Sequence, residues 1–267
     1  MEQFSKTLNE KGVVILEEFI DNDTCDNIIN DFYQFKNNSE NNSISNHRLY
    51  NLHLQSENVR NMLFSDKILS YLDNYFKKKT ALNSTIYFET GSQQCIHRDT
   101  PFFWSEPNEG EFVGVWFALE EANEKNGTLE YYPYGHTFTI DGKLYGNEHK
   151  DKSPAELFSK IGDDMEELCR KNSMKKESPI IKKGSVVVWH ADLPHGGSPI
   201  LNTNKTRHSL VAHYFPENSY ITNIDYYFGR SENKKIMDFT EAPNNRKMRD
   251  VTLTQFVENG VCNKGIK

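Results

Sequence analysis

Residues 112–120, FVGVWFALE, are the stretch that decides the fold, because valine, tryptophan and phenylalanine favour pleated strands with a buried face. Five similar short runs accompany it along the chain, separated by turns or loops. They are STIYFE (84–89), QQCIHRD (93–99), TLEYYP (128–133), GSVVVWH (184–190) and HSLVAHYF (208–215). Several short strands of this kind are typical of a β-sandwich or barrel. We therefore expect a mainly β fold.

Helical patterns flank and interrupt these runs. GVVILEEF (12–19) reads as a short strand, and residues 21–24 offer N-caps to a helix whose apolar residues recur at helical spacing. A second helix is expected near 56–78. Residues 145–176 read as one or two helices inserted in the β region, either a lid or a plain surface element. The tail after Phe215 is polar and irregular.

Nothing in the sequence divides the chain into separate units. Its 267 residues, 12% of them aromatic, suffice for one large packed domain, and no Pro- or Gly-rich linker is visible. We expect a single domain over residues 1–267. It would comprise an N-terminal region (about 1–83), a β core (about 84–217) containing the helical insertion (about 145–176), and the polar tail.

Composition excludes several classes of protein. The net charge is −7 and the basic residues are dispersed, which argues against a nucleic-acid partner. The first residues lack a basic start followed by an apolar run, and no segment approaches 18 apolar residues, so we expect a cytoplasmic protein without a membrane span. Four widely spaced cysteines form no C-x-x-C pair and are expected to be reduced thiols: Cys25, Cys95, Cys169 and Cys262.

A metal site is indicated by one of three H-x-D triplets. Side chains at i and i+2 on a strand leave the same face, so both can reach one ion. Only His97-Arg98-Asp99 combines a strand-like context with a later histidine on a distant run, His195 in LPHGGSPI. The triplet at 149–151 lacks the strand-like context, and the triplet at 190–192 lacks a later histidine on a distant run. Two imidazoles and one carboxylate suit a non-haem Fe(II) centre with open coordination positions.

Arg207 is the second informative feature of the sequence. It opens the run RHSLVAHYF, where it shares one face with Ser209 and His213. An arginine pointing into a barrel is costly unless it meets a carboxylate, and a bidentate pair is its natural partner. That carboxylate could belong to a cosubstrate.

Together these segments resemble the phytanoyl-CoA dioxygenase family of Fe(II)- and 2-oxoglutarate-dependent oxygenases. The resemblance covers most of residues 10–217, and it rests on GVVILEEFIDNDTCDNI (12–28), HRDTPFF (97–103), GVWFALEEANEKNGTLEYYP (114–133) and WHADLPHGGSPILNTNKTRHSLVAHYF (189–215). It implies a double-stranded β-helix, a cupin-like jelly-roll barrel with helices packed on one side. One departure is YPYGH (132–136), where family members often carry P-G-S-H.

The resemblance also implies roles for particular residues. His97, Asp99 and His195 match the family's iron ligands, and Arg207 matches the arginine that binds the distal carboxylate of 2-oxoglutarate. Ser209 would assist Arg207, and Gln94 matches a position near the cosubstrate, although strand alternation would place Gln93 on the His97 face. The implied reaction is hydroxylation of a small molecule, with O2 and 2-oxoglutarate consumed and succinate and CO2 released.

Several questions stay open at this level. Candidate substrate contacts are Arg98, Phe102, Phe103, Trp104, Tyr132, Tyr134 and His213, although aromatic residues beside a barrel strand are commonly core. Alternative functions are a cupin-type metal-binding isomerase, lyase or ligand-binding module that needs no 2-oxoglutarate, a protein hydroxylase, and an inactive scaffold. The sequence names neither the substrate nor the oligomeric state.

Overall fold

The computed structural model describes residues 1–38, 48–103, 105–106, 112–217, 219–232, 239–250 and 255–256. Among these residues the largest element is a nine-stranded mixed sheet of order β1-β7-β5-β9-β3-β12-β11, with β2 also paired to β3, and β13 to β2. The bounds are β1 (Val13–Leu16), β2 (Arg48–Tyr50), β3 (Thr80–Phe88), β5 (Val113–Ala118), β7 (Val186–His190), β9 (Ser209–Pro216), β11 (Phe239–Ala242), β12 (Arg246–Arg249) and β13 (Gln255–Phe256).

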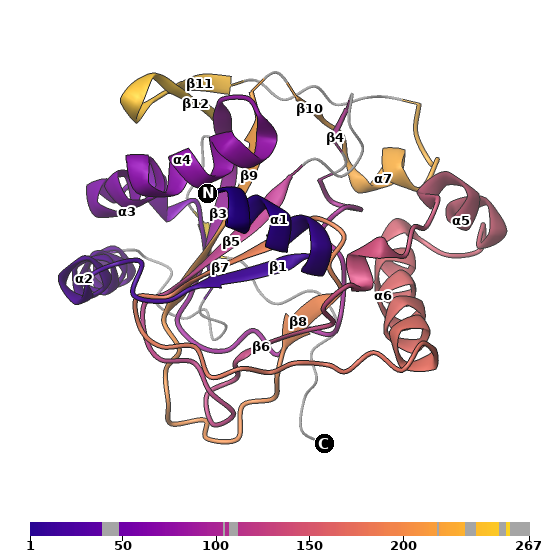
Figure 1. The fold of residues 1–267 in the computed structure, drawn as a ribbon, viewed down its shortest axis with the longest axis horizontal. Helices are drawn as coiled ribbons and strands as arrows, with labels where there is room; N and C mark the ends of the chain where they lie inside the picture. Colours follow the sequence, from indigo (N-terminus) through magenta and orange to yellow (C-terminus); the bar gives the residue numbers. More distant parts are fainter. Residues whose placement is uncertain are drawn as a thin grey trace.

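A smaller sheet of β6 (Leu129–Tyr131) and β8 (His195–Gly197) closes the barrel below the large sheet (Figure 1). A further short pair joins β4 (Ser105–Glu106) to β10 (Tyr220–Ile221). Apolar side chains from both larger sheets, such as Trp116, Val187 and Leu129, form one buried cluster between them. The architecture is the expected jelly-roll.

Helices cover the outer face of the large sheet (Figure 1). They are α1 (Glu2–Lys11), α2 (Asn22–Asn38), α3 (Glu57–Leu63) and α4 (Asp66–Phe76). Strand alternation explains how one sheet serves two cores, because successive side chains point to opposite faces. Val115 and Phe117 pack in the cluster beneath the helices, whereas Trp116 between them points into the barrel.

The remaining helices lie at the other side of the barrel (Figure 1): α5 (Gly142–Glu148), α6 (Pro154–Lys171) and α7 (Ile224–Tyr227). Helix α6 begins with a capping box, in which Ser153 and Glu156 satisfy each other's backbone N–H groups. Gly162 brings this helix close to the barrel, since a Cβ there would lie 2.2 Å from the Ile96 carbonyl oxygen. Helix α6 is therefore held against the segment that carries His97.

Some local expectations were wrong. QQCIHRD is not a regular strand, because it pairs only through single bridges such as the one between His97 and His195. The helix expected over 56–78 is two helices, α3 and α4, and the N-terminal helix α1 was not foreseen. The tail contains α7 and strands that extend the large sheet. Single-turn 3₁₀ helices occupy Leu52–Leu54, Gly135–Thr137 and Pro243–Asn245.

The cysteines only partly match the expectation of reduced thiols. Cys25 and Cys169 are buried and free, and burial raises the pKa of each thiol to about 11. Cys95 is disulfide-bonded, so the expectation was wrong there. The spacing of cysteines along a sequence cannot reveal a pairing that the tertiary fold creates. Cys262 lies outside the described residues.

Candidate metal and anion site

His97, Asp99 and His195 meet inside the barrel, at its edge beside β8. Their potential ligand atoms all lie within 4.8 Å of one another, and all three residues are buried. The distances are 3.7 Å from His97 Nε2 to Asp99 Oδ1 and 3.8 Å from His195 Nε2 to Asp99 Oδ2. Reciprocal backbone hydrogen bonds between His97 and His195 fix this approach. The three atoms can therefore reach one metal ion.

Both imidazole rings are oriented by the backbone. The Nδ1 atom of His97 lies 2.8 Å from the Cys95 carbonyl oxygen, and that of His195 lies 2.9 Å from the Leu193 carbonyl oxygen. A carbonyl oxygen only accepts, so each Nδ1 carries the proton and each Nε2 keeps its lone pair. Burial, followed by the neighbouring His195, lowers the pKa of His97 to about 3. Its ring is thus neutral, as metal binding requires.

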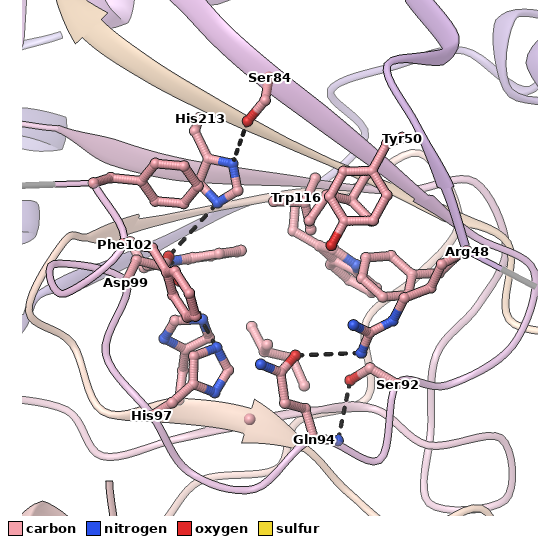
Figure 2. A pocket seen from close by; sticks show the side chains of 18 of the residues that line it. Arg48, Tyr50, Ser84, Ser92, Gln94, His97, Asp99, Phe102, Trp116 and His213 are labelled. Atoms are coloured by element: carbon pink, nitrogen blue, oxygen red, sulfur yellow. Dashed lines mark hydrogen bonds and ion pairs between the residues drawn. The ribbon is translucent and has the colours of Figure 1, made fainter. Parts of the chain in front are cut away.

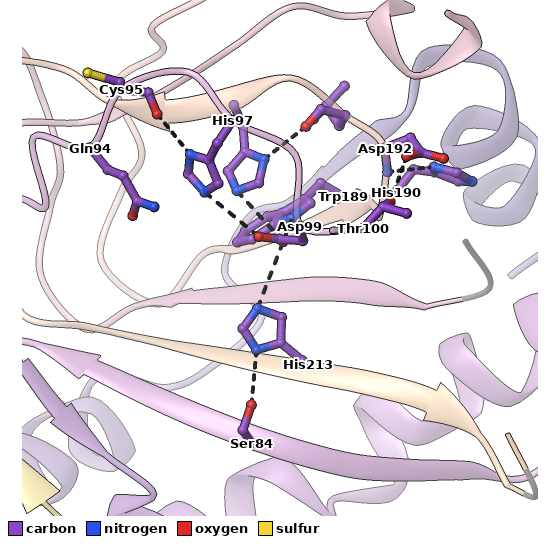
Figure 3. Close-up of polar contacts among 12 residues, drawn as sticks. Ser84, Gln94, Cys95, His97, Asp99, Thr100, Trp189, His190, Asp192 and His213 are labelled. Carbon is purple, nitrogen blue, oxygen red and sulfur yellow. Dashed lines mark hydrogen bonds and ion pairs between the residues drawn. The ribbon is translucent and has the colours of Figure 1, made fainter. Parts of the chain in front are cut away.

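The Asp99 carboxylate is held ionised and fixed in place. Burial alone would raise its pKa, but His195, His213, His97 and the indole N–H of Trp189 outweigh this, and the pKa is lowered. The indole donates to Asp99 Oδ2 at 2.9 Å. His213 Nε2 lies 3.8 Å from the same oxygen, and the opposite nitrogen of this ring contacts Ser84 Oγ at 3.3 Å (Figure 3).

Arg207 is a buried cation at the same cavity. Its Nη1 donates to the Gly127 carbonyl oxygen at 2.8 Å and its Nη2 to Ser209 Oγ at 3.3 Å, whereas its Nε has no partner. Burial, together with Arg48, lowers its pKa to about 9. Among the described residues no carboxylate pairs with it. Such a guanidinium is suited to binding an anionic ligand.

One cavity of about 310 Å³ connects these groups. Of the candidate substrate contacts, Phe102, Phe103 and His213 line it, and so does Gln94 (Figure 2). The alternation argument for Gln93 was wrong, because Gln93 adopts a left-handed φ of 49° that interrupts the alternation. Gln93 instead accepts a hydrogen bond from the Ile200 N–H.

Other candidates point elsewhere. Arg98 was expected to face the substrate, but it is absent from the cavity lining and pairs with Asp192. Tyr132 is buried against Ile96 and Cys169 and donates to Glu166, so it too is absent from the cavity lining. Tyr134 is exposed, and Trp104 lies outside the described residues.

Sequence reasoning missed much of the cavity wall, including four large side chains. Trp189 could have been found, because it shares the inward face of β7 with Val187. The other three, Arg48, Phe158 and Arg249, come from elements distant in sequence, and no local pattern marks them.

The fold and the site define a class of protein, a jelly-roll with a two-histidine, one-carboxylate centre. The particular family follows from comparison: the sequence profile of the phytanoyl-CoA dioxygenase family matches residues 8–209, and the chain belongs to this family. It is 23% identical over 193 residues to a phytanoyl-CoA dioxygenase domain-containing protein 1 homologue of Caenorhabditis elegans, covering 71% of this chain and 65% of that protein.

Two further proteins are similar to this chain, one in sequence and one in fold. A probable alpha-ketoglutarate-dependent hypophosphite dioxygenase of Stutzerimonas stutzeri is 27% identical over 190 residues, covering 69% of this chain and 62% of that protein. Both sequence matches thus span less than two thirds of the relatives' length. The crystal structure of the non-haem alpha-ketoglutarate-dependent epimerase SnoN from nogalamycin biosynthesis superposes with a TM-score of 0.63 at 12% identity, covering 93% of this chain and 97% of that one. This shows the shared fold.

Proposed function

We propose that this protein is an Fe(II)- and 2-oxoglutarate-dependent dioxygenase that hydroxylates a small molecule. One observation carries the proposal: a two-histidine, one-carboxylate cluster shares a single cavity with a buried arginine that no described carboxylate neutralises. A metal site alone would fit a cupin-type isomerase or binding module. The arginine adds a place for the carboxylate of a cosubstrate.

The residues present fit a divalent metal. Both Nε2 atoms carry lone pairs directed towards Asp99, and each ring is held by a carbonyl acceptor at its other nitrogen. Such outer hydrogen bonds are typical of metal-binding histidines. His97, Asp99 and His195 would hold iron, leaving positions open for a bidentate ligand and O2.

The part of the cavity around Arg207 fits 2-oxoglutarate. The Arg207 guanidinium would bind the distal carboxylate, and Ser209, which accepts a hydrogen bond from Arg207 Nη2, would hold the guanidinium in place. Phe88 and Trp116 pack near the guanidinium, with ring centroids 5.8 and 5.3 Å from Arg207 Cζ. When bound, iron and 2-oxoglutarate together supply the oxidant by coupling O2 cleavage to decarboxylation. The chain's own residues orient both and exclude water.

The size of the cavity favours a small substrate. About 310 Å³ lies at the lower end of the range for ligand pockets, and part of it would hold the cosubstrate. Phe102, Phe103 and Phe158 supply apolar surface beside the cluster, and we propose that Phe102, Phe103 and His213 contact the substrate.

Among the described residues, no helix has both the length and the apolar character to cross a membrane.

Calorimetric titration of 2-oxoglutarate under anaerobic Fe(II) tests the function directly, followed by succinate formation on admitting O2. Replacing Arg207 with methionine should weaken 2-oxoglutarate binding by at least about 30-fold, the expected effect of losing one side of a buried ion pair. The matched control, Arg170→Ala at an exposed position, should leave binding unchanged. If the metal-loaded protein does not bind 2-oxoglutarate, the proposed function is wrong.

A further inference from the structure

Arg207 lies just outside the regular part of the large sheet. Strand β9 begins two residues later, at Ser209, which stands opposite Phe88 of β3. Among the described residues, the only backbone hydrogen bond of Arg207 runs from its N–H to the Glu89 carbonyl oxygen, at 2.8 Å. The end of a strand frays unless other contacts hold it. The direction of the Arg207 guanidinium therefore depends on how its chain neighbours are fixed.

His208, the next residue, is fixed on the opposite face of the sheet. Because strand side chains alternate, Arg207 points into the cavity and His208 lies beneath helix α2. The centroid of its buried ring lies 5.9 Å from that of Phe32 and 5.4 Å from that of Tyr33, both on α2. Its N–H donates to Glu120 Oε2 at 2.9 Å, and its carbonyl oxygen accepts from the Glu120 N–H at 3.1 Å. Both its backbone and its ring are thus anchored.

The imidazole of His208 belongs to a directed hydrogen-bond network. Its Nδ1 lies 2.7 Å from the Tyr87 hydroxyl, and its Nε2 lies 3.1 Å from the Tyr33 hydroxyl. Tyr33 donates its proton to Glu89 at 3.4 Å, because a carboxylate that is paired with Lys36 only accepts. The Tyr33 oxygen therefore accepts from the Nε2–H of His208. That leaves Nδ1 to accept from Tyr87.

This network, which we call the His208 network, joins three elements around the start of β9. Tyr87 lies on β3, Tyr33 and Lys36 lie on α2, and Glu89 directly follows β3. Glu89 is the residue whose carbonyl oxygen also holds the Arg207 N–H. A buried polar network of this kind makes its surroundings rigid. The segment that carries Arg207 is therefore held from two sides, through the ring of His208 and through Glu89.

We propose that His208 is a positioning residue for the cosubstrate: its hydrogen bonds to Tyr33 and Tyr87 fix the backbone from which Arg207 reaches the distal carboxylate of 2-oxoglutarate. This inference rests on the proposed function. His208 is absent from the cavity lining, so it acts through Arg207 and not by touching a ligand. Its loss should weaken only those ligands that use Arg207.

Two 2-oxo acids test this on protein loaded with Mn(II). 2-Oxoglutarate carries the distal carboxylate, whereas 2-oxobutyrate has the same 2-oxo acid group but ends in a methyl group. Their dissociation constants are obtained from the rise in melting temperature with ligand concentration. The preference for 2-oxoglutarate, which is the ratio of the two constants, reports the contribution of Arg207. His208→Leu should lower this preference by about three- to tenfold, as expected for the loss of about one hydrogen bond, and leave 2-oxobutyrate binding within about twofold of wild type.

Three further variants separate positioning from stability. Val115→Ala removes packing from the same face of the sheet, away from the His208 network, and should lower the melting temperature but keep the preference. His208→Gln, whose amide both donates and accepts, should recover part of the preference. If His208→Leu does not fold, Tyr33→Phe interrupts the network at a half-buried position and should lower the preference by about twofold.

The outcomes are distinct. An unchanged preference in the folded His208 and Tyr33 variants overturns the proposal. So does an equal weakening of both 2-oxo acids by His208→Leu, or a loss of preference in Val115→Ala that matches it. If wild-type protein does not bind 2-oxoglutarate, the proposed function itself fails; if it binds but the preference does not depend on His208, only the positioning role fails.

Discussion

Replacing Trp189 with phenylalanine tests whether the orientation of Asp99 controls metal binding. The indole N–H is the only hydrogen-bond donor that the described residues direct at this carboxylate, at 2.9 Å from Oδ2. Phenylalanine keeps most of the buried ring but removes the donor. The carboxylate then loses a fixed orientation and a bond that stabilises its charge.

The size of the effect follows from the kind of bond. A hydrogen bond to a charged group contributes about 1.5–3 kcal/mol, which corresponds to roughly 10- to 150-fold in affinity. Removing a hydrogen bond behind a metal ligand usually costs about 10- to 100-fold in affinity. We therefore expect Trp189→Phe to raise the Fe(II) dissociation constant by about 10- to 100-fold.

Anaerobic calorimetric titration with Fe(II) measures this directly. The control is Trp116→Phe, because Trp116 also lines the cavity but lies near Arg207 rather than Asp99. Trp116→Phe should keep the Fe(II) affinity of wild type. If folded Trp189→Phe binds Fe(II) within twofold of wild type, the reasoning about Asp99 is refuted.

Three further predictions concern stability. Gly114→Ala should lower the free energy of unfolding in urea by about 1–3 kcal/mol and weaken Fe(II) binding, because a Cβ there would lie 2.2 Å from the Trp189 indole. An unchanged free energy of unfolding and an unchanged Fe(II) affinity would show that the indole has room to move. Asp192→Ala should lower the free energy of unfolding by about 3 kcal/mol, because it leaves buried Arg98 without its ion-pair partner. A loss below about 1 kcal/mol would show that the Arg98–Asp192 pair does not stabilise the fold. The metal-free protein should lose stability as pH falls from 6.5 towards 4. The reason is that burial lowers the pKa of His97 to about 3 and those of His53 and His190 to about 4, so these histidines accept protons in this range only when the protein unfolds. Equal free energies of unfolding at pH 7 and pH 5 would contradict this.

The barrel was predictable because its determinants are local. Alternating apolar runs mark β3, β5, β7 and β9 in the sequence, since a strand with one or two buried faces needs that pattern. The family resemblance identified the candidate metal ligands and Arg207 for the same reason, because each belongs to a short motif. The structure brings all four to one cavity.

Expectations failed where the backbone departs from regular geometry. Gln94 rather than Gln93 lines the cavity because a single left-handed residue interrupts the alternation. The partner of Arg98 lies in the turn after β7, so nothing within the H-x-D segment showed that this side chain points away. Strand parity holds only while successive residues keep extended dihedral angles.

The sequence by itself thus determined the jelly-roll class and the residue types that suit a metal and a carboxylate. Tertiary structure alone decided that three side chains from distant elements complete the wall: Arg48, Phe158 and Arg249. Arg48 reaches the cavity because β2 pairs with β3 in a register that sets it opposite Phe88. Register and packing depend on contacts between segments far apart in the chain, and no local pattern of residues records them.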